Sequence, residues 1–508
     1  MSNETQFLPL LIIVIVLSSF ILVGLVNKAR EGMAYGFSHR YIGRVGGGAA
    51  IASNWMSAAS FLGIAGMLYL QGYLALAYII GWTGGYVLLL VLLAGQLRRF
   101  GKHTAPDFVG ARYESAAARL ISAIISVVIS VIYCVAQFKG IGMIFAWLFS
   151  IDYTTGVTVG ALAVVSYVVF SGMLGLTRNQ QFQYYVLIVS FILPLMVLAR
   201  KMGYFWLLPQ FGYGAALDEL SRESGINLAA PYASASFFQW IALCFTLMVG
   251  TAGLPHVLSR FYVVPNIRDA RWSLVWGLFF IALIYWSAPA YGVFARILEL
   301  HAHAIPDPAT ARGLADMVVI NTAIRGGLPP WLVGVLAAGA MSAAFFTVAG
   351  LLITGAASVS YDIYGQFVNR NASESRKMTV AKVAAVLLAA VVLLVALRPP
   401  GLIVEIIAVA FALAGNTIFP VFVLGIWWGR ANRQGAIAGM LAGSLITFAE
   451  PLFGGVSPLA GQFLPVTSSA LIGAPVVILV IIAVSLATPP PSDDMRRFLA
   501  EEVHGHLD

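Results

Sequence analysis

Long apolar stretches separated by short polar loops run along the whole chain. Windows of about 20 apolar residues, the length that a helix needs to cross a bilayer, recur from end to end. They predict about thirteen transmembrane helices, at residues 7–26, 46–70, 73–96, 118–149, 154–172, 182–200, 236–260, 272–297, 329–358, 379–397, 401–427, 434–450 and 468–488. The pattern therefore indicates an all-α polytopic membrane protein, with residues 1–508 as one membrane domain.

One apolar stretch, residues 245–262 (FTLMVGTAGLPHVLSRFY), is interrupted at its middle by Gly250, Gly253 and Pro255. Proline lacks a backbone donor and clashes with the preceding turn, and glycine loosens the backbone. The peptide groups that lose helical partners cannot be satisfied by hydrocarbon, so such a break must face protein or a water-filled cavity. Discontinuous helices of this kind hold the substrate and the coupling ion in secondary transporters. The sequence therefore indicates a transporter.

A second apolar stretch, residues 46–70, also carries small residues at its middle and lies five spans earlier. Two interrupted spans five apart, in opposite orientations, are typical of an inverted repeat. We expect repeats at 44–200 and 235–427, with 7–26 as an accessory first helix and 434–488 as accessory C-terminal helices. For residues 46–70, close helix packing at small residues explains the composition equally well.

Composition and charge agree with this assignment. The chain is 60% hydrophobic and 10% charged, and its net charge is +8. Because most Lys and Arg residues fall in loops on one side, the positive-inside rule predicts an outer N-terminus and an inner C-terminus in a cell (inner or plasma) membrane. Attraction to anionic lipid then accounts for the charge without nucleic acid. Cys134 and Cys244 lie within predicted spans and give no disulfide framework. No nucleophile–base pair or phosphate loop suggests an enzyme.

Lys139 is the basic residue that falls inside a predicted span. A lone cation there costs about 2.5–3.5 kcal/mol on insertion scales, so it needs a partner. We expect that partner to be an acid on another helix, such as Glu405, or the carboxylate of a substrate; snorkelling along the four-carbon stem is a further explanation. Gln137, two residues earlier, either donates a further hydrogen bond to substrate or makes a packing contact.

The Pro-containing break offers a second way to hold an anion. Residues from Thr251 to Gly253 are expected to present free backbone N–H groups and the positive end of a half-helix, which suits a carboxylate. His256 follows Pro255 directly. It is either a proton relay, should the coupling ion be H⁺, or a structural histidine with satisfied hydrogen bonds.

Three segments and the order of the spans resemble the solute:sodium symporter family. The segments are ASNWMSAASFLGIAG, FTLMVGTAGLPHVLSRFYVVPNIRDAR and AGAMSAAFFTVAGLLITGAASVSYDIY. Within that family the chain is most similar to the acetate and monocarboxylate permease branch. The resemblance covers nearly the whole chain. It implies a LeuT-type five-plus-five inverted repeat with about 13 helices, alternating access, and a substrate site between the two broken spans.

The resemblance also implies a sodium site. Its ligands are the backbone carbonyls of Ser53, Met56 and Ala343 and the two hydroxyl positions that here hold Phe346 and Thr347. Na⁺ is a hard cation that needs oxygen ligands, and phenylalanine has no hydroxyl. Thr347 must then supply the side-chain oxygen, helped by Ser342, Ser57 or water. Taken without the resemblance, Thr347 is a helix hydroxyl that bonds to its own turn.

The expected function is cation-coupled import, with Na⁺ as the coupling ion and H⁺ as an alternative, of a short monocarboxylate such as acetate, propionate, pyruvate or lactate. Ser60 stands where other family members contact a sugar, and a small side chain there suits a small ligand. The expected substrate-binding residues are Ser57, Ser60, Gln137, Lys139, Thr251, Gly253 and His256. A facilitated carrier and a solute-sensing receptor are the competing functions. The lipid bilayer is the expected surrounding, and no obligate protein partner is evident.

Overall fold

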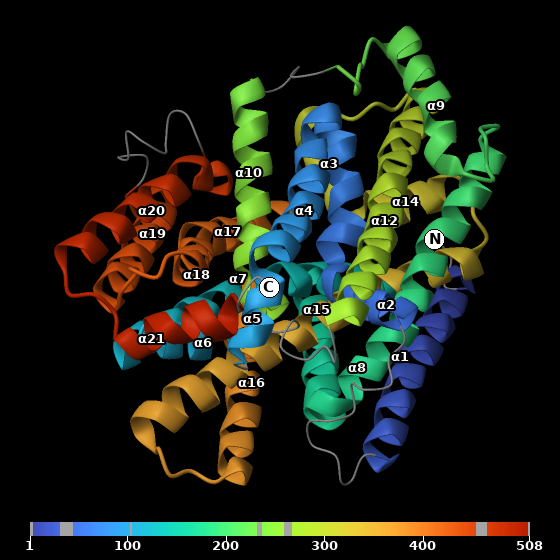
Figure 1. Ribbon diagram of the computed structural model, residues 1–508. Helices are drawn as coiled ribbons and strands as arrows, with labels where there is room; N and C mark the ends of the chain where they lie inside the picture. Colours follow the sequence, from blue (N-terminus) through green and yellow to red (C-terminus); the bar gives the residue numbers. More distant parts are fainter. Residues whose placement is uncertain are drawn as a thin grey trace.

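The computed structural model describes residues 4–30, 44–101, 104–230, 236–258, 267–453 and 465–505 (Figure 1). Within these ranges all regular structure is helical, with α labels for α-helices and η labels for π- or 3-10-helical segments. Eight helices are long and apolar enough to cross a membrane, and three shorter apolar helices lie at Phe7–Ser19, Tyr153–Val168 and Phe237–Gly253. The all-α, multi-pass membrane fold expected from the sequence is confirmed.

The first part of the chain runs to the end of α8. Its elements are α1 (Glu4–Arg30), α2 (Arg44–Trp55), η2 (Ala59–Gly63), α3 (Ile64–Gln71), η3 (Gly72–Ala75), α4 (Leu76–Leu89), η4 (Leu90–Ala94), α5 (Gly95–Phe100), α6 (Ala105–Arg112), α7 (Ala116–Phe149) and α8 (Tyr153–Lys201). The predicted spans 154–172 and 182–200 both lie within α8. The Tyr153 hydroxyl donates to the Ala396 carbonyl, and the Lys201 ammonium donates to the Gly327 carbonyl. The two ends of α8 therefore lie beside segments predicted to be on the same, outer face.

The second part of the chain contains the remaining helices. They are α9 (Pro209–Ser224), α10 (Phe237–Gly253), α11 (Pro255–Leu258), α12 (Ile267–His301), α13 (Pro308–Leu314), η6 (Ala315–Met317), α14 (Val318–Arg325), α15 (Pro330–Ala357), η7 (Ser358–Val368), α16 (Glu374–Ala396), α17 (Ile403–Asn416), α18 (Ile418–Trp427), α19 (Arg433–Phe453), η8 (Val466–Ser468), α20 (Ala470–Ala487), α21 (Asp493–Phe498) and η9 (Leu499–Val503). Figure 1 shows α1 at one edge of the bundle and α19 and α20 at the opposite edge.

Both expected helix interruptions are present. Helix α2 stops at Trp55, Met56 and Ser57 are not helical, and the chain continues as the π-helical η2 and then α3. Helix α10 stops at Gly253, Leu254 has an extended backbone (φ −69°, ψ 121°), and α11 begins at Pro255. A proline at the first helical position has no hydrogen bond to lose, so the chain resumes a helix there.

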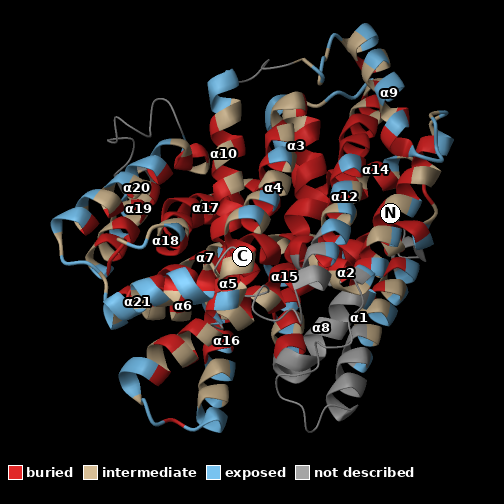
Figure 2. Cartoon of the chain, viewed as in Figure 1, coloured by how far each residue is buried: buried red, intermediate tan, exposed pale blue. Residues whose placement is uncertain are grey.

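Small residues let the broken helices approach their neighbours closely. A Cβ atom on Gly48 would overlap Trp276 of α12, and one on Gly250 would overlap the Phe411 carbonyl of α17. The helices in the middle of the bundle are accordingly largely buried (Figure 2). Residues 46–70 therefore show both features: the helix is interrupted, and its small residues also pack closely against a neighbouring helix.

Candidate functional site

The break between α2 and η2 is the centre of the candidate site. The Ala58 N–H donates to the Gln137 side-chain oxygen on α7 at 2.8 Å, and the Ala59 N–H donates to the Ser57 hydroxyl at 3.2 Å. Helix α7 comes this close because Gly140 faces Ala58, where an added Cβ would stand 2.9 Å from the Ala58 Cβ. Two backbone donors that the break frees are therefore satisfied by neighbouring side chains.

The orientation of the Gln137 amide follows from this contact. Because Ala58 contributes an N–H, the Gln137 atom that meets it must be the acceptor Oε1. The amide Nε2 is then the other end of a fully buried side chain, and it has no hydrogen-bond partner among the described residues. A buried amide nitrogen is a strong donor whose desolvation is costly while it stays unpaired. Gln137 thus presents donor capacity beside the α2 break.

Three of the predicted sodium ligands meet at the same break. The Thr347 hydroxyl is 3.0 Å from the Ala343 carbonyl oxygen and 3.4 Å from the Met56 carbonyl oxygen. Three of the expected oxygens, one from Met56 at the break and two from α15, therefore converge. The bond to Ala343 is also the bond to its own turn that the sequence alone suggests for a helical threonine.

The remaining predicted sodium ligands, Ser53 and Phe346, are buried and lie close in sequence to Met56 and Thr347. Ser53 stands three positions before Met56, which is about one helical turn, and its hydroxyl has no partner among the described residues. Phe346 is buried and brings no hydroxyl oxygen. Ser342, considered as a substitute, donates its hydroxyl to the Ala338 carbonyl at 2.7 Å, within α15.

An aromatic cluster that sequence reasoning missed packs against the α2 break. The Trp55 indole N–H donates to the Tyr285 hydroxyl at 2.8 Å, and the Ser60 hydroxyl is 3.0 Å from the same oxygen. The rings of Trp82, Tyr86 and Phe411 surround Trp55, with centroids between 4.7 and 6.3 Å from it. The predicted Ser60 is thus engaged with α12. No local pattern links these residues, because they come from α2, η2, α4, α12 and α17.

The α11 side contributes His256. Its ring lies edge-on to that of Tyr133 on α7, with centroids 5.5 Å apart, and the side chain is buried. Thr251 and Gly253 pack elsewhere. The Thr251 hydroxyl donates to the Leu247 carbonyl at 2.7 Å, and Gly253 meets the Ala414 carbonyl of α17. The expected free N–H groups and positive helix end at Thr251 to Gly253 are wrong, because these residues form the last turn of α10, which is its negative end, and the next helix begins only at Pro255. Direct contact of Thr251 or Gly253 with a substrate stays a prediction.

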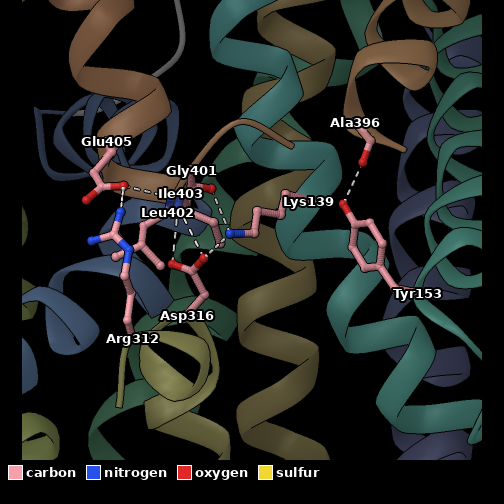
Figure 3. Close-up of polar contacts among 9 residues, drawn as sticks. All are labelled: Lys139, Tyr153, Arg312, Asp316, Ala396, Gly401, Leu402, Ile403 and Glu405. Carbon is pink, nitrogen blue, oxygen red and sulfur yellow. Dashed lines mark hydrogen bonds and ion pairs between the residues drawn. The ribbon is translucent and has the colours of Figure 1, made fainter. Parts of the chain in front are cut away.

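Lys139 lies outside this centre, in a separate ion pair (Figure 3). Its ammonium is 2.5 Å from Asp316 Oδ2 of η6 and donates to the Gly401 carbonyl at 2.8 Å. The expected acidic partner is therefore present, but it is Asp316 and not Glu405. Glu405 instead pairs with Arg312 at 2.7 Å and accepts the Leu402 N–H at 2.9 Å. The correction reflects a contact between residues 177 positions apart, which no sequence spacing reveals.

Asp316 is held by more than the lysine. The Ile403 N–H donates to both carboxylate oxygens, at 3.2 and 3.3 Å. Asp316 lies outside the spans and is almost fully buried. Burial raises the pKa of the Asp316 carboxyl above its ordinary value, and the Lys139 ammonium opposes that rise.

Sequence relatives of this chain are symporters. The Sodium:solute symporter family matches residues 35–443. The uncharacterized symporter YwcA of Bacillus subtilis is 31% identical, over 78% of this chain and 76% of its own length. The uncharacterized symporter H16_A2524 of Cupriavidus necator is 29% identical, over 96% of this chain and 92% of its own length.

Two solved transporters share the arrangement of helices. A substrate-bound, outward-open Na⁺-coupled sialic acid symporter superposes with a TM-score of 0.74 at 15% identity, covering 96% of this chain and 99% of that one. Mhp1, a nucleobase-cation-symport-1 family transporter, superposes with a TM-score of 0.54 at 15% identity, covering 92% and 97%. At such identities the likeness concerns the fold alone, and it confirms the LeuT-type architecture.

Proposed function

The chain belongs to the sodium:solute symporter family, and from that premise we propose that it couples Na⁺ entry to the import of short monocarboxylates across the inner or plasma membrane. As a member of that family it is a solute transporter and not an enzyme. One observation carries the finer proposal. The α2 break is contacted both by oxygens suited to a cation, at Met56, and by a side-chain amide suited to a carboxylate, at Ala58.

The oxygens at the break suit Na⁺. By analogy with other hard cations, about six oxygen ligands are wanted. Thr347 supplies a hydroxyl, and Met56 and Ala343 supply carbonyls. The Ser53 carbonyl is the proposed fourth ligand, and water completes the shell where Phe346 offers no side-chain oxygen. A site that depends on one protein hydroxyl is expected to bind Na⁺ weakly and to release it readily to the cytoplasm.

A small carboxylate suits the Gln137 amide at the break. The free Gln137 Nε2 is a donor that a carboxylate oxygen can accept, and the adjacent Ser57 is a further polar contact in this proposal. Aromatic rings pack around Trp55 next to the break, and in this proposal they favour a small acid over a bulky one. Acetate, propionate, pyruvate and lactate meet both conditions. Ser60, Thr251, Gly253 and His256 complete the proposed substrate-binding set.

Proton coupling is the alternative that a specific observation favours. His256 is buried beside Tyr133 at the α11 end of the site, where a titrating imidazole could exchange a proton as the helices move. A facilitated carrier would need neither ion. A solute sensor would bind the same acids without moving them.

Uptake into proteoliposomes separates these functions. Purified protein is reconstituted and given labelled acetate, propionate, pyruvate or lactate, with an inward Na⁺ gradient, an inward H⁺ gradient, or neither. Accumulation above equilibrium with Na⁺ alone is the expected result. Accumulation with H⁺ alone would transfer coupling to His256, and equilibration without a gradient would indicate a facilitated carrier. Binding without uptake of any acid would favour the sensor.

A further inference from the structure

The groups that hold Asp316 form an anion-binding site built into the transmembrane helices. The ammonium comes from α7, and the backbone N–H comes from Ile403, the first residue of the 14-residue helix α17. A lysine together with a helix N-terminus is a favourable environment for a carboxylate. The Gly401 carbonyl accepts a further ammonium proton and fixes the position of the cation. Figure 3 shows the Lys139 and Asp316 side chains pointing toward one another.

The anion, by contrast, comes from a segment outside the spans. Residues 308–325, comprising α13, η6 and α14, connect α12 to α15, and we name them the cap. The cap rests on α3, the second half of the broken helix. The contact is so close that a Cβ on Gly66 would overlap the Ala315 carbonyl. A second pair, Arg312 with Glu405, ties the cap to α17. The cap therefore delivers a carboxylate to a site made by other elements.

A buried ion pair that is broken leaves a costly charge behind. The side chains of Lys139 and Asp316 are only 13% and 4% exposed. If the cap lifts as the transporter opens to this face, the lysine and the Ile403 N–H lose their anion together. Removing one partner of a buried pair is strongly unfavourable unless another charge replaces it. A monocarboxylate has the same functional group as the Asp316 side chain.

We propose that Lys139 and the Ile403 N–H form an outer carboxylate site, which Asp316 occupies when the cap is closed and the substrate occupies when the cap is lifted. The inference rests on the proposed function, because it takes the substrate to be a monocarboxylate. Lys139 and Gln137 are two positions apart on α7, so they face different directions. Helix α7 ends at Phe149 on the face predicted to be outside, and Lys139 is nearer to that end than Gln137, so in this proposal the substrate meets Lys139 first and the α2 break afterwards. Charge is conserved in the exchange, since one carboxylate replaces another.

The test uses uptake kinetics of the full chain in proteoliposomes at saturating Na⁺. Asp316→Asn weakens the internal competitor, so the KM for external acetate should fall severalfold. The paired variant Lys139→Met with Asp316→Asn removes both charges without leaving either unpaired. Its KM should rise about tenfold or more, as expected for loss of a hydrogen bond to a charged group. Unlabelled propionate should compete correspondingly less well in that variant.

A matched control lies away from the cap. Lys377→Gln and Glu374→Gln together remove an ion pair at the start of α16, whose side chains are 20% and 73% exposed, and should leave the KM for acetate within about twofold. Lys139→Arg keeps the cation and should retain most of the affinity. If the double variant Lys139→Met with Asp316→Asn fails to fold, the KM values of Asp316→Asn and Lys139→Arg still test whether the substrate replaces Asp316.

Two outcomes would overturn the exchange. One is a KM equal to that of the wild type in the folded double variant Lys139→Met with Asp316→Asn. The other is an unchanged or raised KM in the single variant Asp316→Asn. Either result would make the Lys139–Asp316 pair a purely structural contact. These results are distinct from failure of the proposed function. That failure would appear in the wild-type protein itself, as absence of monocarboxylate accumulation under a Na⁺ gradient, and it would overturn this inference too.

Discussion

At the scale of single residues, the Thr347 hydroxyl makes the contact that joins α15 to the α2 break. We expect Thr347→Val, which removes the hydroxyl with little change in shape, to raise the Na⁺ concentration for half-maximal uptake. Loss of one hydrogen-bonding oxygen, worth about 0.5–1.5 kcal/mol, corresponds to about two- to tenfold. The measurement is acetate uptake against Na⁺ concentration. Ser342→Ala is the control, because that hydroxyl bonds within α15. Equal Na⁺ dependence in both variants would move the ion site elsewhere.

Gln137 gives a second test at the same scale. Gln137→Glu keeps the oxygen that accepts the Ala58 N–H but replaces the free donor with a negative charge. A carboxylate substrate should be repelled, and we expect the KM for acetate to rise about tenfold or more while the protein stays folded. Gln239→Glu is the matched control, since glutamate serves as well as glutamine in the capping box at the start of α10. Undiminished uptake by Gln137→Glu would assign Gln137 to packing.

Residue chemistry could be read from the sequence only where it is local. Gln137 and Thr347 were identifiable because one lies beside a charge in a span and the other matches a family position. The partners of Lys139 and Trp55 were not, since Asp316 is 177 residues and Tyr285 is 230 residues away along the chain. Pairings at that distance depend on which helices the fold places together, and one sequence does not contain that information.

At the scale of elements, the seating of the cap on α3 depends on Gly66. We expect Gly66→Ala to hold the cap off α3, because its Cβ would overlap the Ala315 carbonyl, and overpacking typically costs about 1–3 kcal/mol. Transport should slow severalfold, and the melting temperature should fall. Gly313→Ala, on the cap itself, is the control, because no atom lies within 4 Å of its added Cβ. If both variants transport like the wild type, the contact has no role in closure.

The helix breaks were predictable to different degrees. Pro255 marks the start of α11 to the residue, because proline chemistry acts locally. The break at Met56 and Ser57 could be placed only within a stretch of small residues, where packing and interruption give the same composition. The π-helical segments η2 and η7 have no signature in the pattern, since a wider i→i+5 turn leaves the hydrophobic composition unchanged.

At the scale of the whole molecule, the fold class was predictable because a bilayer permits few solutions. Spanning segments must satisfy every backbone group internally, so hydropathy alone indicates helices. The division into repeats at 44–200 and 235–427, with accessory helices at 7–26 and 434–488, stays a prediction. The count of thirteen spans also stays a prediction, because two predicted spans lie within the single element α8. Hydropathy does not show where a helix bends or which helices correspond in the two repeats.

The orientation in the membrane decides which way substrate meets the cap. The positive-inside assignment places Ala304, just before the cap, outside and Ser375, near the start of α16, inside, and both positions are exposed. We expect a membrane-impermeant thiol reagent added to intact cells to label Ala304→Cys, and to label Ser375→Cys only after permeabilisation. The native Cys134 and Cys244 are buried, so their background should be low. The reverse labelling pattern would put the Lys139 site on the cytoplasmic face, where it would act in substrate release instead of capture.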